Sequence, residues 1–312
     1  THSGPENEPL LQGLVTDMKE LSETPTAELE TKLMPLVDGY REWIRQEAVR
    51  AEKSDEGLGE FREATERMLK RSREAADRIE PKASTHMRRI EAGIRILLDD
   101  KDEKAADAFR FANRAMYLQR VHTMLSEAKR REESKTLADF DEPKNRSWRA
   151  FQLAFVLLNL PSLAKPGHSD RLDDGANEQV ADLLWFPTGG GKTEAYLGLT
   201  AFTLGIRRLQ GDLGGLRADA GVAVLMRYTL RLLTLQQFQR ATALICACET
   251  IRRESPANWG TWPFRIGLWV GQATTPNKTA DAQDQVSNDG WGRGSVRQLT
   301  NCPWCGSPID FK

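Results

Sequence analysis

The feature that most constrains the fold is a glycine run that lies between an apolar segment and an amphipathic one. Residues 182–194 read Asp-Leu-Leu-Trp-Phe-Pro-Thr-Gly-Gly-Gly-Lys-Thr-Glu. The apolar run 183–186 predicts a short buried strand, and the apolar residues after Lys192-Thr193 recur at helical spacing, at Tyr196, Leu199 and Phe202. Glycines let backbone N–H groups turn toward phosphate oxygens, and a helix N-terminus adds its positive dipole end. Strand, glycine turn and helix together predict a phosphate-binding loop.

In such a loop Lys192 would reach the β- and γ-phosphates of a nucleoside triphosphate, and the Thr193 hydroxyl would hold Mg²⁺. The strict eight-residue motif begins with glycine, whereas this sequence has Phe186 there, so the match is to the variant Pro-Thr-Gly-Gly-Gly-Lys-Thr. The alternative is a glycine-rich turn that carries a surface lysine. The segments on both sides favour the nucleotide site.

Length and charge limit the remaining possibilities. The 312 residues suggest about two domains, and a formal net charge of −1 means that any nucleic-acid binding must come from local patches. No run of eighteen apolar residues is present, so we expect no membrane span. The N-terminus has no signal-peptide pattern and no initiator Met, which indicates processing or truncation. With four cysteines, we expect a cytoplasmic protein in a reducing compartment.

Residues 1–146 predict an all-helical N-terminal domain. Apolar positions recur at helical spacing over residues 28–49, 61–79, 87–98 and from about 103 to 125. A charged linker, 132–146, follows and marks the predicted domain boundary. Arginines interleave with glutamates in these helices, namely Arg71, Arg73, Arg88 and Arg89. They indicate either solvated helix faces or a basic ridge along a nucleic-acid channel.

Residues 147–312 predict a second, α/β domain. The continuous apolar run at 221–226 predicts a second buried strand, and 264–270 predicts a third strand, with a long helix between them that ends near Arg253. A polar loop is expected over 272–290. Strand and helix alternate, so we expect a parallel sheet whose ligand-binding loops lie at the carboxyl edge of the strands.

Two further segments extend the predicted site. Arg149 and Gln152 precede an apolar helix over 153–160, and the Gln152 amide offers the donor and acceptor that match adenine N6 and N7; an exposed residue at a helix start is the alternative. Arg227, Thr229 and Arg231 lie where a strand passes into a helix, which suits contacts to a sugar-phosphate backbone. The nucleotide-binding set is therefore Arg149, Gln152, Thr188, Gly189, Gly190, Gly191, Lys192, Thr193 and Glu194.

The sequence Cys302-Pro-Trp-Cys305-Gly306 has the form of half a zinc site, with two thiolates on a tight knuckle. Zinc needs four ligands, and Cys246 and Cys248 lie within a helical pattern where they would pack as small apolar residues. The alternative is a plain turn with buried thiols. A redox pair fits less well, because this CxxC does not open a helix.

Together, the Gln152 segment, the glycine loop and the stretch from Thr229 to Gln236 resemble, in order, the Q motif, motif I and motif Ia of superfamily 2 helicases. More narrowly, residues 184–198 and 226–238 resemble the DrmA family, the helicase-like proteins of the DISARM anti-phage defence system. The resemblance covers about 147–312. It implies an ATP-driven motor on DNA with two RecA-like lobes, which works beside a DrmB-like partner, and it makes 147–312 the first part of lobe 1 with a zinc knuckle at its end.

The resemblance is incomplete, because a motor of this superfamily also needs an Asp-Glu pair and arginines from a second lobe. The sequence shows neither, so the 312 residues alone are expected to bind nucleotide weakly or not at all and not to hydrolyse it. Two alternatives remain open. One is a different phosphate-loop NTPase, and the other is a non-catalytic DNA- or partner-binding module with a vestigial nucleotide loop.

Overall fold

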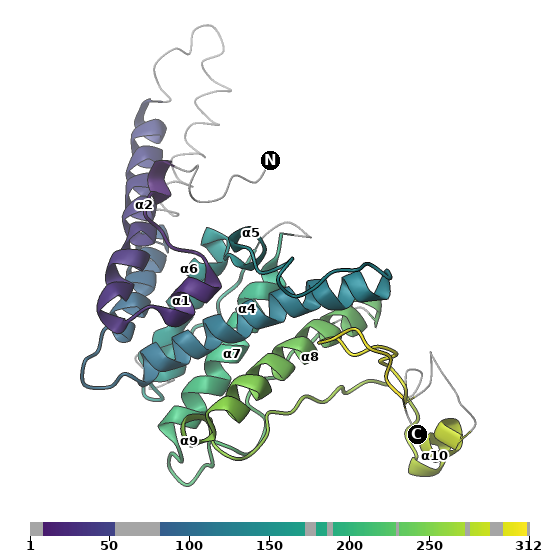
Figure 1. The fold of residues 1–312 in the computed structure, drawn as a ribbon. Helices are drawn as coiled ribbons and strands as arrows, with labels where there is room; N and C mark the ends of the chain where they lie inside the picture. Colours follow the sequence, from purple (N-terminus) through teal and green to yellow (C-terminus); the bar gives the residue numbers. More distant parts are fainter. Residues whose placement is uncertain are drawn as a thin grey trace, which may run out of the picture. The chain divides into compact units, whose positions relative to one another are not determined.

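The computed structural model describes residues 9–53, 82–171, 179–185, 190–228, 231–271, 275–287 and 296–310. Helices are the regular structure of this part of the chain (Figure 1). They are α1 (Met18–Glu23), α2 (Thr26–Lys53), a helix over 82–97, α4 (Lys104–Arg130), α5 (Pro143–Arg146), α6 (Ala150–Ala164), α7 (Lys192–Gln210), α8 (Arg231–Glu254), α9 (Pro256–Trp259) and α10 (Thr279–Ser287), with short 3-10 turns at Pro9–Leu11 and Ser169–Arg171.

The expected α/β fold with a parallel-sheet, RecA-like lobe is wrong for this structure. Across the described residues no strand pairs into a sheet, and the β contacts are isolated bridges such as Leu213 with Leu216 and Asn301 with Pro308. In their described residues, the segments predicted as buried strands have no regular secondary structure and expose large apolar side chains: Leu183 is 86% exposed, Leu225 87% and Trp269 99%. An apolar run favours extended backbone, but a strand exists only where a neighbour takes its N–H and C=O groups.

The helices predicted in the N-terminal region are confirmed where the structure describes them. The pattern over 28–49 is α2, the one over 87–98 is the helix 82–97, and the one from about 103 is α4. The helix predicted over 61–79 lies outside the described residues. Asp17 caps α1 by accepting the Lys19 backbone N–H at 2.8 Å.

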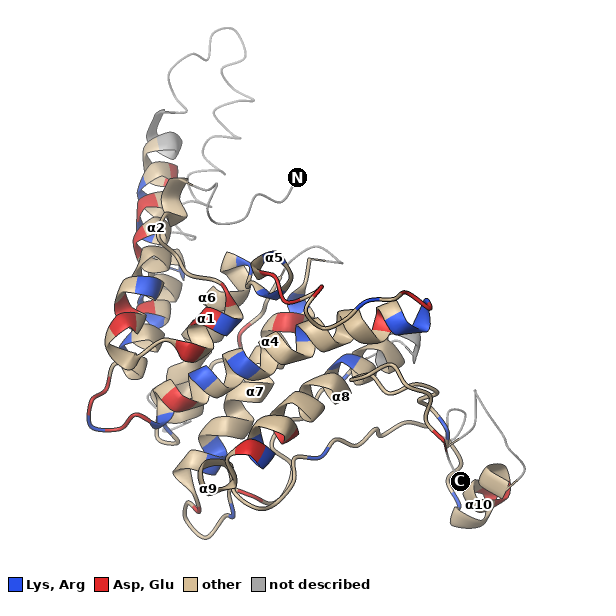
Figure 2. Ribbon diagram, viewed as in Figure 1, with Lys and Arg blue, Asp and Glu red and all other residues tan. Residues whose placement is uncertain are grey.

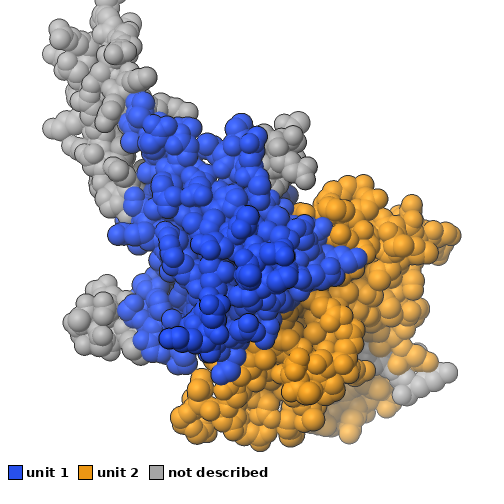
Figure 3. Space-filling view, turned by 60° about the vertical axis from the view of Figure 1, so that its left-hand side comes forward, with its two compact units in different colours: residues 1–110, 148–199 blue, residues 111–147, 200–312 orange. Residues whose placement is uncertain are grey.

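The chain forms two compact units (Figure 3). Unit 1 contains residues 1–110 and 148–199, and unit 2 contains 111–147 and 200–312. Each unit draws on residues from both sides of the predicted linker 132–146, and the domain division predicted from the sequence stays a prediction.

The core of unit 1 is made by one apolar face of each helix. Its largest fully buried side chains are Met18, Leu21, Leu29, Leu33, Ile94, Leu97, Phe109, Leu153, Leu157 and Leu160. Helix 82–97 lies very close to α6, because a Cβ on Gly93 would meet the Leu157 carbonyl oxygen at 1.9 Å. The turn between α1 and α2 is fixed by Arg110 of α4, whose Nε donates to the Thr24 carbonyl at 2.9 Å.

Unit 2 is built around α8 and the parts of α4 and α7 that belong to it. Phe111 packs on Trp259 and Phe264, with ring centroids 4.3 and 5.9 Å apart, and Phe202 and Leu244 are fully buried. The predicted linker lies against α4 through two hydrogen bonds, Tyr117 Oη with Asp141 at 3.1 Å and Arg120 Nε with the Asn145 carbonyl at 3.0 Å.

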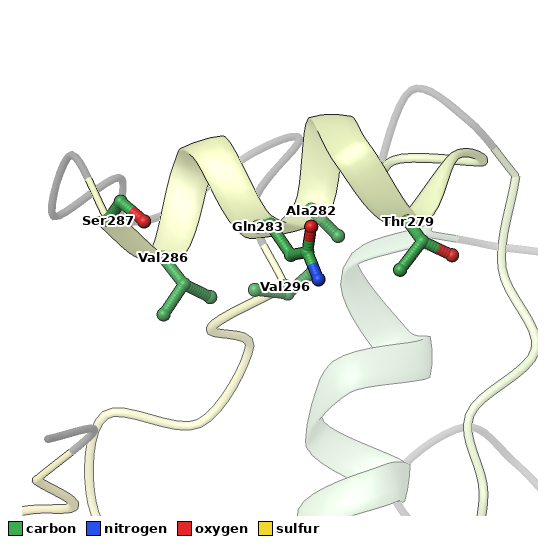
Figure 4. Close-up of a pocket in the computed structure, with 6 residues that line it drawn as sticks. All are labelled: Thr279, Ala282, Gln283, Val286, Ser287 and Val296. Carbon is green, nitrogen blue, oxygen red and sulfur yellow. The ribbon is translucent and has the colours of Figure 1, made fainter.

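The prediction of a polar loop over 272–290 is partly wrong, because Thr279–Ser287 forms α10. Its residues are polar but suit a helix, since Ala, Gln and Asp place no strong breaker within it. A pocket along α10 is lined by small, uncharged side chains and contains none of the predicted site residues (Figure 4).

Charges of both signs alternate along the N-terminal helices (Figure 2). On α2, Arg41 pairs with Asp38 at 2.6 Å and Arg45 with Glu42 at 2.7 Å, both one turn apart on exposed faces. Such pairs are typical of solvated helix faces. Among the residues that the structure describes, no helix combines the length and the apolar character needed to cross a bilayer.

Candidate nucleotide-binding site

The site is built where α6 and α7 meet in unit 1. Trp148, directly before α6, is 3% exposed, and its indole lies against α7 so closely that a Cβ on Gly198 would meet Trp148 Cη2 at 2.7 Å. The Trp148 backbone N–H donates to the Thr16 carbonyl at 2.9 Å. A large ring thus packs against a glycine, and this contact brings the first turn of α6 beside the first turn of α7.

Two side chains from the start of α6 bind the glycine turn. Arg149 Nη1 donates to the Gly190 carbonyl at 2.7 Å, and Gln152 Nε2 donates to the Gly191 carbonyl at 2.7 Å. Gln152 Oε1 accepts the Arg149 backbone N–H at 2.8 Å, which satisfies one of the free donors at the helix N-terminus. The predicted juxtaposition of the Gln152 segment and the glycine loop is therefore present in the structure.

The glycine turn leads directly into α7. Gly191 has φ +85°, a left-handed backbone conformation that favours glycine, and a Cβ there would also displace Gln152 Nε2, which lies 2.7 Å from that position. Lys192 and Thr193 are half-buried in the first turn of α7, and Glu194, 7% exposed, lies beside them. The N-terminus of a 19-residue helix behind a glycine turn fits a phosphate group, because its first amides have no partner within the helix.

The remaining predicted nucleotide residues, Thr188 and Gly189, lie outside the described residues. Gln152 is 3% exposed and uses its oxygen and one N–H within the protein. An amide has a second N–H and a second lone pair, so adenine recognition by Gln152 stays a prediction.

The structure leaves the predicted DNA contacts as predictions. Arg227 is exposed in an extended segment, Thr229 lies outside the described residues, and Arg231 is the first residue of α8. The structure does not describe the Arg231 side chain, so it does not bring these three residues together into a surface.

The cysteine knuckle is a tight turn docked on α4 within unit 2. Gly306 N–H donates to the Cys302 carbonyl and Cys302 N–H to the Ser307 carbonyl, both at 2.8 Å. The Trp304 ring stacks on His122 with centroids 3.4 Å apart, and Ser126 Oγ donates to the Cys302 carbonyl at 3.1 Å. Gly306 has φ +74° and approaches the backbone of Ser126, so it is a required glycine.

The four thiols differ in their environments. Hydrogen bonds from Ser307 lower the pKa of Cys305, whereas burial raises the pKa of Cys246 to about 11 and raises that of fully buried Cys248 still more. Cys246 also lies close to the knuckle, and the charges of Cys302 and Cys305 contribute to the raised pKa of its thiol. Even so, no three His, Cys, Asp or Glu side chains of the described chain are arranged to hold a metal. The knuckle therefore offers two cysteines, half of the four ligands that zinc needs, and zinc stays a prediction.

Sequence reasoning did not find one cluster beside the loop. Arg89 of helix 82–97 donates to Asp182 through its two terminal nitrogens, Nη1 and Nη2, at 2.6 and 2.7 Å, and Nη2 lies 3.2 Å from Asp170. Hydrogen bonding to Asp182 is the main cause that raises the pKa of Arg89 further above its already high value. Asp182 directly precedes the apolar run that leads into the glycines. An acid at this position is the feature of the sequence that could have pointed to the cluster.

The sequence and the site thus define a mainly helical protein with a phosphate-loop-like turn at the N-terminus of α7. No protein-family model matches the chain. The chain is similar to a curated DISARM protein, DrmA of Bacillus paralicheniformis, with 39% identity over 251 residues. The match covers 77% of the chain and 21% of that relative, so the chain spans about a fifth of the relative's length. Over this region the chain is a DrmA-like protein.

Proposed function

We propose that this chain is the nucleotide-binding portion of an ATP-dependent DNA helicase or translocase of the DISARM anti-phage defence system. The observation that carries the proposal is the contact between α6 and the glycine turn, in which Arg149 and Gln152 bind the carbonyls of Gly190 and Gly191. Two distant segments of the sequence meet there at the start of α7. The similarity to a DISARM protein supports the biological setting.

In this proposal the chain's own residues bind and orient the nucleotide. Lys192 would contact the phosphates, Thr193 would hold Mg²⁺, and the first amides of α7 would face phosphate oxygens. ATP with Mg²⁺ would supply the phosphoanhydride whose hydrolysis drives movement. Gln152, already hydrogen-bonded to the turn, would use its remaining N–H and lone pair for adenine.

DNA and a DrmB-like protein are the partners that we propose. Arg227, Thr229 and Arg231 would contact the sugar-phosphate backbone, which carries no sequence information and gives a salt-dependent affinity. A non-catalytic DNA-binding module with a vestigial loop is the alternative. It predicts that Arg231→Ala weakens DNA binding, whereas Lys192→Ala changes neither DNA binding nor ATP turnover.

The test is DNA-stimulated ATP hydrolysis by the protein at its natural full length, because the matched region is 21% of the relative. Lys192→Ala should lower turnover by about two orders of magnitude, since charge on the transferring phosphoryl group loses its lysine. The matched control is Lys165→Ala, an exposed lysine just after α6, which should leave turnover unchanged. Equal turnover by wild type and Lys192→Ala would refute the proposal.

A further inference from the structure

The segment 179–185, which leads into the glycine loop, buries few of its apolar side chains. The described residues 179–185 form no helix or strand, and Val180, Leu183 and Trp185 are 48%, 86% and 83% exposed. Side chains that remain in water contribute little to fixing a backbone, because the hydrophobic term scales with the apolar area removed from water. Within those residues the segment is held by polar contacts, the Val180 N–H to the Asp170 carbonyl at 3.0 Å and the pairing of Asp182 with Arg89.

Arg89 connects this segment to a second one. Its guanidinium grips both Asp182 oxygens and also reaches the Asp170 carboxylate, which follows α6 in the 3-10 turn Ser169–Arg171. The three side chains are 16–21% exposed, so the network is largely shielded from water. A two-pronged arginine–carboxylate pair fixes both distance and orientation, which a single point charge does not.

The helix that carries Arg89 is itself fixed against α6. Gly93, one turn after Arg89, lies against the Leu157 carbonyl of α6, and the neighbouring Ile90 and Ile94 are buried. The first turn of α6 in turn binds the glycine turn through Arg149 and Gln152. The described glycines are thus held from the α6 side, and the segment before them is held from helix 82–97.

We propose that Arg89 is a positioning residue of the nucleotide site, through which the N-terminal helices fix the segment entering the glycine loop. The proposal rests on the proposed function for what the loop binds. It also replaces the interpretation of Arg89 as part of a basic ridge for nucleic acid, because its guanidinium is committed to two carboxylates.

The first test needs no nucleotide. Hydrogen exchange at the Val180 amide, which donates to the Asp170 carbonyl in the segment that Arg89 holds, is compared for wild type, Arg89→Ala and Asp182→Asn. Each variant should exchange about tenfold faster there, and the double variant no faster than Arg89→Ala alone, because Asp182→Asn weakens only a contact that Arg89→Ala already removes. The control is Arg95→Ala on the same helix, which removes an exposed pair with Glu91 and should change nothing.

The second test measures ATP turnover by the full-length protein. Arg89→Ala should raise the ATP concentration for half-maximal turnover about tenfold with little change in kcat. Arg89→Lys should raise this ATP concentration less than Arg89→Ala does, because lysine keeps the positive charge but cannot make the two parallel hydrogen bonds of a guanidinium. Well below the melting temperature, a purely structural role would leave this concentration unchanged.

The proposed function and the positioning role of Arg89 are contradicted by different results. If wild type does not hydrolyse ATP, the proposed function is wrong, and hydrogen exchange alone decides the role of Arg89. If wild type hydrolyses ATP but Arg89→Ala matches Arg95→Ala in both measurements, the positioning role is wrong. Additive effects of Arg89→Ala and Asp182→Asn on exchange would also overturn it.

Discussion

Single residues have roles here that their chemical type alone does not assign. Gln152 has a donor and an acceptor that match adenine. In the structure its Oε1 accepts the Arg149 N–H at the start of its own helix, and its Nε2 donates to the Gly191 carbonyl. Arg89 stands in the sequence among surface arginines, and it binds two acids beside the loop. In both cases one partner comes from far along the chain, Gly191 for Gln152 and Asp182 for Arg89.

The cysteines allow a prediction at the residue scale. Only the thiolate reacts with alkylating agents, so Cys305, with its lowered pKa, should react first. Cys246, with a pKa of about 11, and buried Cys248 should react at least about a hundredfold more slowly at pH 8. Iodoacetamide labelling followed by peptide mass spectrometry measures the order. Early modification of Cys248 would contradict the burial described here.

The same experiment tests zinc. If the knuckle binds Zn²⁺, added zinc should slow the alkylation of Cys302 and Cys305, and a chelator should restore it. Labelling that is indifferent to zinc would leave the knuckle as a turn docked on α4.

Among the elements, helices can be predicted well from this sequence and strands cannot. The periods of α2, α4 and α8 appear in the sequence because a helix satisfies its own backbone and needs a neighbour only for its apolar face. An extended run needs another strand for every hydrogen bond it makes. In the described chain the runs 221–226 and 264–270 form no strand ladder.

The contact between helix 82–97 and α6 yields a prediction at this scale. Gly93→Ala would place a methyl group 1.9 Å from the Leu157 carbonyl oxygen, which is backbone and cannot rotate away. The helices would have to separate, at a cost of about 3 kcal/mol of unfolding free energy. Urea denaturation measures this cost.

The matched control is Ala92→Ser, which also adds one heavy atom but at the neighbouring, exposed position of the same helix. It should cost no more than about 0.5 kcal/mol, the difference in helix propensity between the two residues. An unchanged midpoint for Gly93→Ala would show that the two helices are not in contact.

At the scale of the whole molecule, one shielded acid makes the stability of unit 2 depend on pH. Unit 2 is fastened by Glu249 of α8, which accepts from Arg252 at 2.6 and 2.8 Å and from the Phe264 N–H at 3.0 Å. Hydrogen bonding to Arg252 is the main cause that lowers the pKa of Glu249 from 4.5 to about 2. A carboxylate whose pKa is lower in the folded state stabilises the fold above its unfolded pKa and loses that effect as pH falls.

Acid should therefore weaken unit 2 as pH falls from about 5 to 2, by at most about 3 kcal/mol from this group. Glu249→Gln should lower the stability of unit 2 at pH 7 and flatten this pH dependence. Hydrogen exchange of α8 amides at pH 7 and pH 3, corrected for intrinsic rates, measures the effect. Glu254→Gln, an exposed glutamate on the same helix, is the control. An equal acid response in both variants would rule out Glu249 as the cause.

The sequence by itself determined the features that depend on neighbouring residues. Helical periods, the glycine turn before α7, the required glycine at 306 and the resemblance to DrmA proteins can all be recognised within short segments of the sequence. The tertiary structure decided which distant groups meet: Trp148 against Gly198, Gln152 on Gly191, and Arg89 between Asp170 and Asp182. It also decided that the apolar extended runs of the described chain form no sheet. The physical reason is the same in each case, because hydrogen bonds, ion pairs and strand ladders need a partner that only the folded chain supplies.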